Sequence, residues 1–254
     1  MTISQEITIH SHVDYDGMRK AGKLAAEMLL KIGEYVQPNV STNYLNNLIH
    51  GWIIDAGAIP APLHYKGFPK SICTSINNVV CHGIPDDKPL NNGDIVNIDV
   101  TVILDGWHGD TSKMFFVGDK VPIKAKRLIE ITYDAMMLGI DQVKPGSPLN
   151  SIGKAIQRYV ESYGYSVVTD YCGHGIGKIF HTLPNVVHYS EPQCKLVMQE
   201  GMFFTIEPMI NLGKSGTRLL ADGWTVVTKD RSLSAQFEHT IAVTNSGYEI
   251  FTIS

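Results

Sequence analysis

The stretch NIDVTVILDGWHGDTSKMFFV, residues 97–117, decides the fold. Apolar Ile98, Val100 and Val102 alternate with polar side chains, which is typical of a half-buried β-strand. Asp105-Gly106 is a strong short-range signal for a hairpin turn. We predict two antiparallel strands, joined by a bulged or wider connection over residues 105–109, with Asp110 opening the second strand.

Two aspartates stand in this stretch although aspartate is depleted in strands. Asp99 lies in the middle of the first predicted strand, and Asp110 at the start of the second. A half-exposed antiparallel sheet carries polar residues on one side as a rule. From the hairpin alone, the two aspartates can belong either to a solvated polar face or to a functional site.

Composition and charge exclude several classes of protein. A chain of 254 residues that is 44% hydrophobic can bury a sizeable core, and a net charge of −4 gives no electrostatic argument for a nucleic-acid or anionic membrane partner. No segment is of signal-peptide type or approaches the ~20 apolar residues of a membrane span. We expect a cytoplasmic protein whose cysteines, which form no CxxC pair, are reduced and mostly buried.

The chain contains an internal duplication. Apolar residues at helical spacing predict helices over residues 14–36, 42–56, 122–143 and 149–163, with a short strand near residues 71–76. The loop His82-Gly83-Ile84 has a counterpart in residues 174–176, and the segments beginning at Gly93 and Asp110 have counterparts beginning at Gly201 and Glu238. We therefore predict a single α+β domain over residues 1–254, with two helix-helix-sheet halves whose antiparallel sheets are covered by helices and related by a pseudo-two-fold axis.

The duplication pairs Asp99 with Glu207 and Asp110 with Glu238, and the axis would bring all four carboxylates together. Buried carboxylates cannot all ionise without a counter-charge, for which a divalent metal is the natural candidate. His174 lies between two glycines, where the backbone can approach closely, and would supply one nitrogen ligand.

Several motifs in order carry a resemblance to a known family. The run from Cys81 to Pro85, the two aspartates, GHGIG with His181 beyond it, FTIEP and FEHTIAV together resemble a type I methionine aminopeptidase of the bacterial kind, over essentially the whole chain. The resemblance implies a pita-bread fold and a metal-dependent aminopeptidase. Its substrates would be nascent polypeptides, from which it removes the initiator methionine when the second residue is small.

The resemblance also implies a site residue by residue. Asp110 and Glu238 would bridge two divalent metal ions (Co, Mn, Fe or Zn), Asp99 would bind one ion, and His174 with Glu207 the other. Such a pair of ions can activate a shared water or hydroxide. The carried-over catalytic residues are Glu207 as acceptor of the water proton, His82 at the scissile amide and leaving nitrogen, and His181 at the substrate carbonyl oxygen.

Two further sets of residues follow from the same resemblance. The methionine pocket would be lined by Tyr65, Phe68, Cys73, Phe180 and Trp224. A monovalent cation would lie near Asn77, Val79 and Ser234. The expected partners are the N-termini of nascent polypeptides, with a transient ribosome contact, no membrane, no nucleic-acid motif and a monomeric chain.

Two other functions remain to be weighed. A proline-cleaving relative of the prolidase or aminopeptidase P kind has similar ligands but generally an additional N-terminal domain, for which a pattern starting near residue 14 leaves no room. A binding protein that kept the fold and lost catalysis would lack ligands, and none is missing. The sequence has no HExxH or GxSxG motif, and we expect the minimal bacterial form, without a zinc-binding extension or a type II insert.

Overall fold

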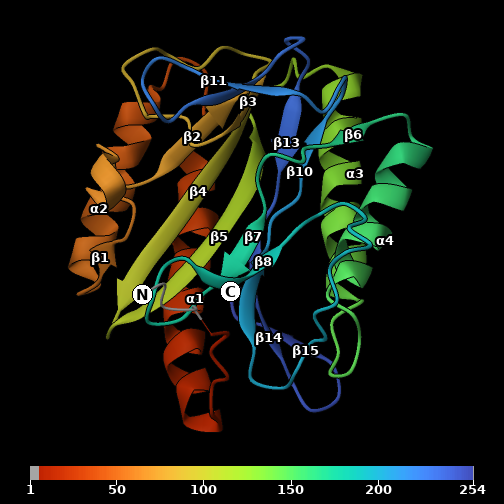
Figure 1. The fold of residues 1–254 in the computed structure, drawn as a ribbon. Coiled ribbons are helices and arrows are strands. Elements are labelled where there is room, and N and C mark those ends of the chain that lie inside the picture. The colour runs from red at the N-terminus through yellow and green to blue at the C-terminus, as the bar shows by residue number, and fades with distance from the viewer. Residues whose placement is uncertain (1–5, 254) are drawn as a thin grey trace.

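The computed structural model describes residues 6–253 (Figure 1). In that range the α-helices are α1 (His12–Ile32), α2 (Thr42–Asp55), α3 (Ile123–Ile140) and α4 (Asn150–Ser162), with short 3-10 turns at Gly33–Tyr35 and Tyr65–Gly67. The strands are β1 (Ile59–Pro60), β2 (Cys73–Ile76), β3 (Val79–Cys81), β4 (Ile95–Leu104), β5 (Trp107–Phe116), β6 (Ser166–Val167), β7 (Gly173–Gly175), β8 (Thr182–Val186), β9 (Phe203–Ile206), β10 (Met209–Asn211), β11 (Thr217–Leu219), β12 (Val226–Thr228), β13 (Ser234–Gln236), β14 (His239–Val243) and β15 (Tyr248–Ile250).

The four predicted helices are confirmed to within a few residues at each end. The start of α2 is fixed by Ser41, whose hydroxyl accepts a hydrogen bond from the backbone N–H of Tyr44 at 3.1 Å. Gly57 lies just after the end of α2, and its φ of +73° is incompatible with a right-handed helix. Local signals in the sequence therefore set both ends of α2.

The central hairpin corrects one prediction. Strands β4 and β5 pair from Ile95–Phe116 to Leu104–Trp107, so the connection is only Asp105 and Gly106, and the wider loop over residues 105–109 is wrong. Both turn residues have positive φ, 51° and 81°, and a turn of this hand matches the twist of the two strands. Buried Trp107 begins the second strand, which places Asp110 inside it rather than at its start.

The predicted two halves are present, each with its own core. In Figure 1, α1 passes behind β4 and β5, while α3 and α4 lie at the right of the view and pack on the second half. The first core contains Leu45 and Ile49 of α2 packed with Ile98 of β4, and the second contains Ile156 of α4 packed with Phe204 of β9. Burial of apolar side chains on one face of each sheet leaves the opposite face free for a site.

The halves meet where β5 lies beside the start of β14. The backbone N–H of Glu238 donates to the carbonyl oxygen of Ser112 at 3.1 Å, and the Thr111 hydroxyl donates to the carbonyl oxygen of Glu238 at 2.7 Å. One sheet runs β1-β4-β2 with β5 on β4, and the other runs β15-β14-β9-β7-β8. This seam brings the two duplicated strand pairs into contact.

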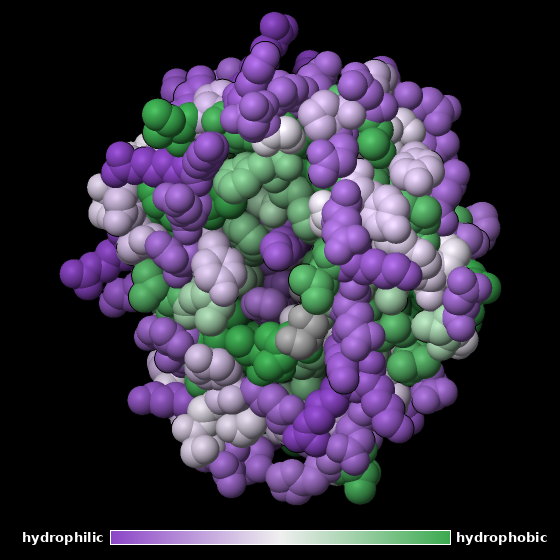
Figure 2. Space-filling view, turned by 180° about the vertical axis from the view of Figure 1, so that it is seen from behind, coloured by the Kyte–Doolittle hydropathy of each residue, from purple (hydrophilic) through white to green (hydrophobic). Residues whose placement is uncertain are grey.

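The face seen from behind is hollowed between apolar walls with hydrophilic groups deeper inside (Figure 2). A cavity of about 290 Å³ lies between α1 and α3 and is lined by Leu29, Leu30, Tyr133, Phe237 and His239, among others.

Among residues 6–253, no helix is both long and apolar enough to cross a membrane.

Candidate active site

One cavity of about 370 Å³ collects the predicted site residues on the sheet face opposite α1 and α3. Asp99 comes from β4, Asp110 from β5 and His174 from the centre of β7. Glu207 stands one residue after β9 and Glu238 one residue before β14, so both lie at strand ends rather than inside strands. The cavity is lined by all five of these side chains together with His82, His181, Tyr65, Phe68, Cys73, Phe180 and Trp224.

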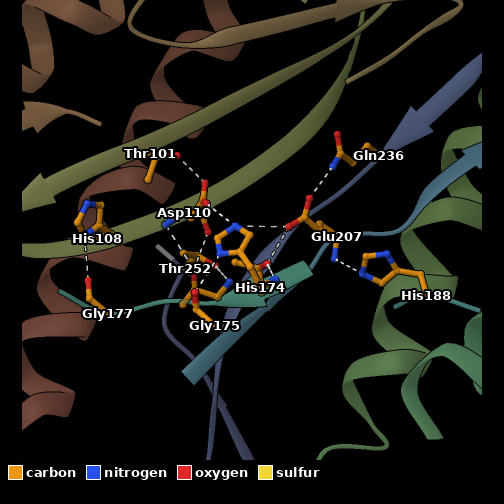
Figure 3. Close-up of polar contacts among 12 residues, drawn as sticks. Thr101, His108, Asp110, His174, Gly175, Gly177, His188, Glu207, Gln236 and Thr252 are labelled. Carbon is orange, nitrogen blue, oxygen red and sulfur yellow. Dashed lines mark hydrogen bonds and ion pairs between the residues drawn. The ribbon is translucent and has the colours of Figure 1, made fainter. Parts of the chain in front are cut away.

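We call the four carboxyl side chains and His174 the charged group. The imidazole of His174 lies between Asp110 and Glu207 (Figure 3). Its Nε2 is 3.5 Å from Oδ2 of Asp110 and 3.7 Å from Oε1 of Glu207. Asp110, His174 and Glu238 each offer one potential ligand atom, and these three atoms lie within 4.8 Å of one another. Nδ1 of His174 is 3.1 Å from the carbonyl oxygen of Gly175, and a donor bond there directs Nε2 at the carboxylates.

The two glycines beside His174 are required by close backbone approach, as predicted. A Cβ on Gly173 would collide with the carbonyl oxygen of Thr205, and one on Gly175 with that of Leu183. The backbone N–H of His174 also donates to the Thr205 hydroxyl at 3.0 Å. These contacts fix the imidazole on its strand.

The carboxyl groups are held in an environment that disfavours their charge. Asp110 is 4% exposed and Glu238 3% exposed. Burial, reinforced by the neighbouring Asp110, raises the pKa of Asp99 and Glu238 well above the ordinary range, and burial raises the pKa of Glu207 to about 7. Within the described part of the chain, Oδ1 of Asp99 is buried without a hydrogen-bond partner.

These observations fit a divalent metal centre. A cation among the carboxylates would favour their ionised forms and give Oδ1 of Asp99 a partner. A donor set of carboxylate oxygens with one imidazole nitrogen suits several divalent metals. The residues that line the cavity can therefore hold such ions.

Two histidines outside the charged group are kept neutral. Burial lowers the pKa of His82, whose backbone has a φ of +55°, uncommon for a residue with a Cβ. Desolvation of the ring, reinforced by His174, lowers the pKa of His181 to about 3. The rings of His181 and His174 lie 4.1 Å apart between centroids. Neutral imidazoles at these places can donate one hydrogen bond and accept another.

The predicted methionine pocket is an aromatic wall beside the charged group. The Tyr65 ring lies 4.9 Å from that of Phe180, and the Phe68 ring meets Trp224 edge to face at 5.2 Å. Cys73 is paired with Asp99 in the β2–β4 register and is buried. All five predicted pocket residues are thus brought together next to the carboxylates.

The structure adds three polar residues that the sequence reasoning missed. The Thr101 hydroxyl donates to Oδ1 of Asp110 at 2.6 Å, the Thr205 hydroxyl to Oε1 of Glu207 at 2.8 Å, and the Gln236 amide to Oε2 of Glu207 at 3.3 Å. Each stands two residues from a carboxylate in the sequence, so the period-2 alternation of a strand could have placed it on the same face.

The residues predicted to hold a monovalent cation lie where the β2–β3 connection meets the start of β13. The backbone N–H of Ser234 donates to the carbonyl oxygen of Asn77 at 2.8 Å, which joins two of the three. Val79 is in β3, which contacts β13. The Ser234 hydroxyl is buried and has no hydrogen-bond partner among residues 6–253.

Comparison with known proteins agrees with this geometry. The model of metallopeptidase family M24 matches residues 16–245. The methionine aminopeptidase of Rickettsia prowazekii (strain Madrid E) is 65% identical over 249 residues, which are 98% of this chain and 96% of that protein. The methionine aminopeptidase of Escherichia coli (strain K12) is 56% identical, covering 97% and 94%.

A crystal structure of methionine aminopeptidase from Rickettsia prowazekii has a TM-score of 0.96 to this fold at 64% identity, covering 98% of this chain and 100% of that one. The two helix-covered halves are the pita-bread arrangement that the sequence resemblance implies. The chain therefore belongs to metallopeptidase family M24 and, within it, to the bacterial type I methionine aminopeptidases.

Proposed function

We propose that the protein removes the N-terminal methionine from nascent polypeptides whose second residue is small, by metal-dependent hydrolysis. The observation that carries this proposal is the single cavity in which five potential metal ligands adjoin an aromatic pocket. The high identity to proteins named methionine aminopeptidase over nearly their full length supports it.

Asp99, Asp110, His174, Glu207 and Glu238 would hold two divalent ions, for which Mn, Fe, Co and Zn are all compatible with the donor atoms. When bound, such ions supply a Lewis acid and a lowered pKa for water. Support for this occupancy comes from the unpartnered Oδ1 of Asp99 and from the raised pKa of the surrounding carboxyl groups.

Glu207 would accept the proton of the attacking water. Bound cations would favour the ionised form of its carboxyl group, which is the form that can accept a proton. Thr205 and Gln236 hold its two carboxylate oxygens, so the group is oriented toward the cavity. These two hydrogen bonds restrict rotation of the Glu207 carboxylate.

His82 and His181 would act on the peptide bond itself. His181, neutral because of its lowered pKa, would donate a hydrogen bond to the substrate carbonyl oxygen as negative charge develops on it. His82 would bind the scissile amide and then the leaving nitrogen. Both line the same cavity as the proposed metal ligands.

Selectivity for methionine would come from Tyr65, Phe68, Cys73, Phe180 and Trp224. Thioether sulfur makes favourable contacts with aromatic rings, and an unbranched side chain fits a narrow aromatic slot. We further propose a monovalent cation near Asn77, Val79 and Ser234, supported by the unpartnered Ser234 hydroxyl within the described residues.

The same proposal extends to the setting of the reaction. We infer one catalytic domain over residues 1–254 that acts as a monomer in the cytoplasm, where nascent chains emerge, with a transient contact to the ribosome. The match of the family model to residues 16–245 supports the single domain.

The test is hydrolysis of two peptides, one beginning Met-Gly and one beginning Ala-Pro, by chelator-stripped protein with Mn, Fe, Co or Zn restored. We expect metal-restored cleavage of the Met-Gly peptide alone. Cleavage of the Ala-Pro peptide would indicate the proline-specific relative. Cleavage of neither with any metal would indicate a binding protein.

A further inference from the structure

The backbone N–H of Glu207 lies where the sheet supplies no acceptor. Strand β9 ends at Ile206 and β10 begins at Met209, and Pro208 between them has no N–H of its own. The N–H of Glu207 instead donates to Nε2 of His188 at 3.0 Å (Figure 3). This bond joins the chain after β8 to the residue proposed as the general base.

His188 is a buried neutral imidazole with a defined proton position. It is 1% exposed, and burial favours the uncharged ring. Because Nε2 accepts a hydrogen bond from an N–H, the ring proton must be on Nδ1. Among residues 6–253, nothing accepts a hydrogen bond from that buried Nδ1–H. A buried unpaired donor is destabilising, so His188 is not explained by optimal packing.

Helix α4 holds the backbone that carries His188. A Cβ on Gly153 would lie 2.6 Å from the carbonyl oxygen of Val187 and 2.7 Å from the N of Tyr189, so the segment presses directly on the helix. Two α4 side chains also accept hydrogen bonds from the following backbone: Gln157 from Ser190 at 2.8 Å and Asn150 from Glu191 at 2.6 Å. The imidazole is thus carried by a fixed segment.

We propose that His188 is a positioning residue, which uses Nε2 to hold the backbone of Glu207 so that its carboxylate faces His174 and Gln236. This inference rests on the proposed function. His188 acts through Glu207 and does not touch the substrate. Without its acceptor, the partly buried Glu207 N–H would lose its hydrogen-bond partner, and the backbone between β9 and Pro208 would no longer be held in this orientation.

The variants that test this are His188→Gln and His188→Met. The Gln side chain carries an amide oxygen that can replace Nε2 as acceptor, whereas Met is of similar length and has only a weak sulfur acceptor. For His188→Met we expect kcat to fall about 10–100-fold with little change in KM, and divalent metal affinity measured by calorimetry to fall about 10–100-fold. We expect His188→Gln to recover both to within about threefold of wild type.

His50→Met is the matched control. His50 is half-buried in α2 and its Nδ1 lies 2.8 Å from the Ser71 hydroxyl, away from the charged group. We expect kcat, KM and metal affinity of this control to match the wild type. Metal-free wild-type protein provides a measurement that needs no variant: nitrogen NMR of the imidazoles should show His188 with Nδ1 protonated and Nε2 unprotonated.

Each outcome decides the proposal. A proton on Nε2 of His188, wild-type kinetics and metal affinity in a folded His188→Met, or a His188→Gln that is as impaired as His188→Met would each overturn it. If the wild-type protein cleaves no Met-Gly peptide, the proposed function is contradicted instead. The NMR and calorimetric results would still decide whether His188 holds Glu207.

Discussion

Nε2 of His174 lies 3.5 Å from Oδ2 of Asp110, although the two residues belong to sheets in different halves of the molecule. Asp110 is tied to the second half by the Thr240 hydroxyl, which donates to its carbonyl oxygen at 2.7 Å. The charged group is therefore complete only when both duplicated halves have folded and met along the seam between β5 and β14.

Asp110→Asn should abolish most metal binding. The change removes a charge from the centre of the site while keeping the shape of the side chain, and we expect metal affinity and kcat/KM to fall by at least about 100-fold. Calorimetric titration of stripped protein with Mn²⁺ measures the first, and Met-Gly hydrolysis the second. Asp119→Asn, at an exposed carboxylate that accepts from Asn92 at 2.8 Å, is the control. Equal affinities in the two variants would contradict the assignment of Asp110.

Thr101→Val should weaken the site without touching a proposed ligand. Thr101 is 1% exposed and its hydroxyl donates to Oδ1 of Asp110 at 2.6 Å, and valine keeps the shape while removing the donor. We expect a loss of about 10–100-fold in metal affinity or kcat/KM, as for other groups that orient a ligand. Thr101→Ser, which keeps the hydroxyl, should stay near the wild type. If both variants behave alike, orientation of Asp110 by this hydroxyl is unimportant.

Two glycine variants should change stability in opposite directions. Gly106 has a φ of +81° in the hairpin turn, so Gly106→Ala should lower the free energy of unfolding by about 1 kcal/mol. Gly51 lies within α2, and a Cβ there meets nothing within 4 Å, so Gly51→Ala should raise it by about 0.5–1 kcal/mol. Urea denaturation measures both, and kcat should not change. A stabilised Gly106→Ala would contradict the left-handed turn.

The sequence predicted what depends on local pattern. Alternation in residues 97–117 predicted the central strands, and Ser41 together with the apolar spacing that follows predicted α2. The carboxylates and His174 were found because the chain is duplicated, which converts weak single motifs into corresponding positions. These signals are all carried by neighbouring residues or by repetition.

What the sequence did not predict depends on geometry or on distant contacts. The Asp105-Gly106 turn was expected to be wider. The sequence does not indicate that Trp107 is buried and pairs with Leu104, which extends the β4–β5 pairing up to the turn. The contacts of Asp110 with Thr240 and of Glu207 with His188 join residues far apart in sequence or on different strands. No local periodicity identifies such partners.

The stabilisation by metal should depend on pH. Burial raises the pKa of Glu207 from 4.5 to about 7, so the folded metal-free protein keeps a proton that the unfolded chain releases. This contribution to stability is complete below pH 4.5 and is lost as the pH rises through 7. Bound metal requires the ionised carboxylate and removes that loss. The increase in Tm on adding saturating Mn²⁺ should therefore be larger at pH 8 than at pH 5.

Comparing metal-loaded and metal-free protein at each pH isolates this effect, because groups remote from the site titrate alike in both. His10, whose pKa is lowered by burial, destabilises the fold as the pH falls below 6.5 with or without metal. An increase in Tm that is the same at pH 5 and pH 8 would mean that the carboxyl groups are already ionised without metal.

Phe68→Leu should broaden the choice of first residue. Phe68 is 2% exposed and its ring meets that of Trp224 edge to face at 5.2 Å between centroids, so a smaller side chain widens the aromatic pocket. A change of this size in a hydrophobic pocket is worth about 1–3 kcal/mol, so the ratio of kcat/KM for Met-Gly over Leu-Gly peptides should fall about tenfold. Phe251→Leu, equally buried at 2% in the first-half core, controls for general loosening. If Phe251→Leu shifts the ratio as much, the Phe68 ring does not set selectivity, and the pocket must be bounded by other residues.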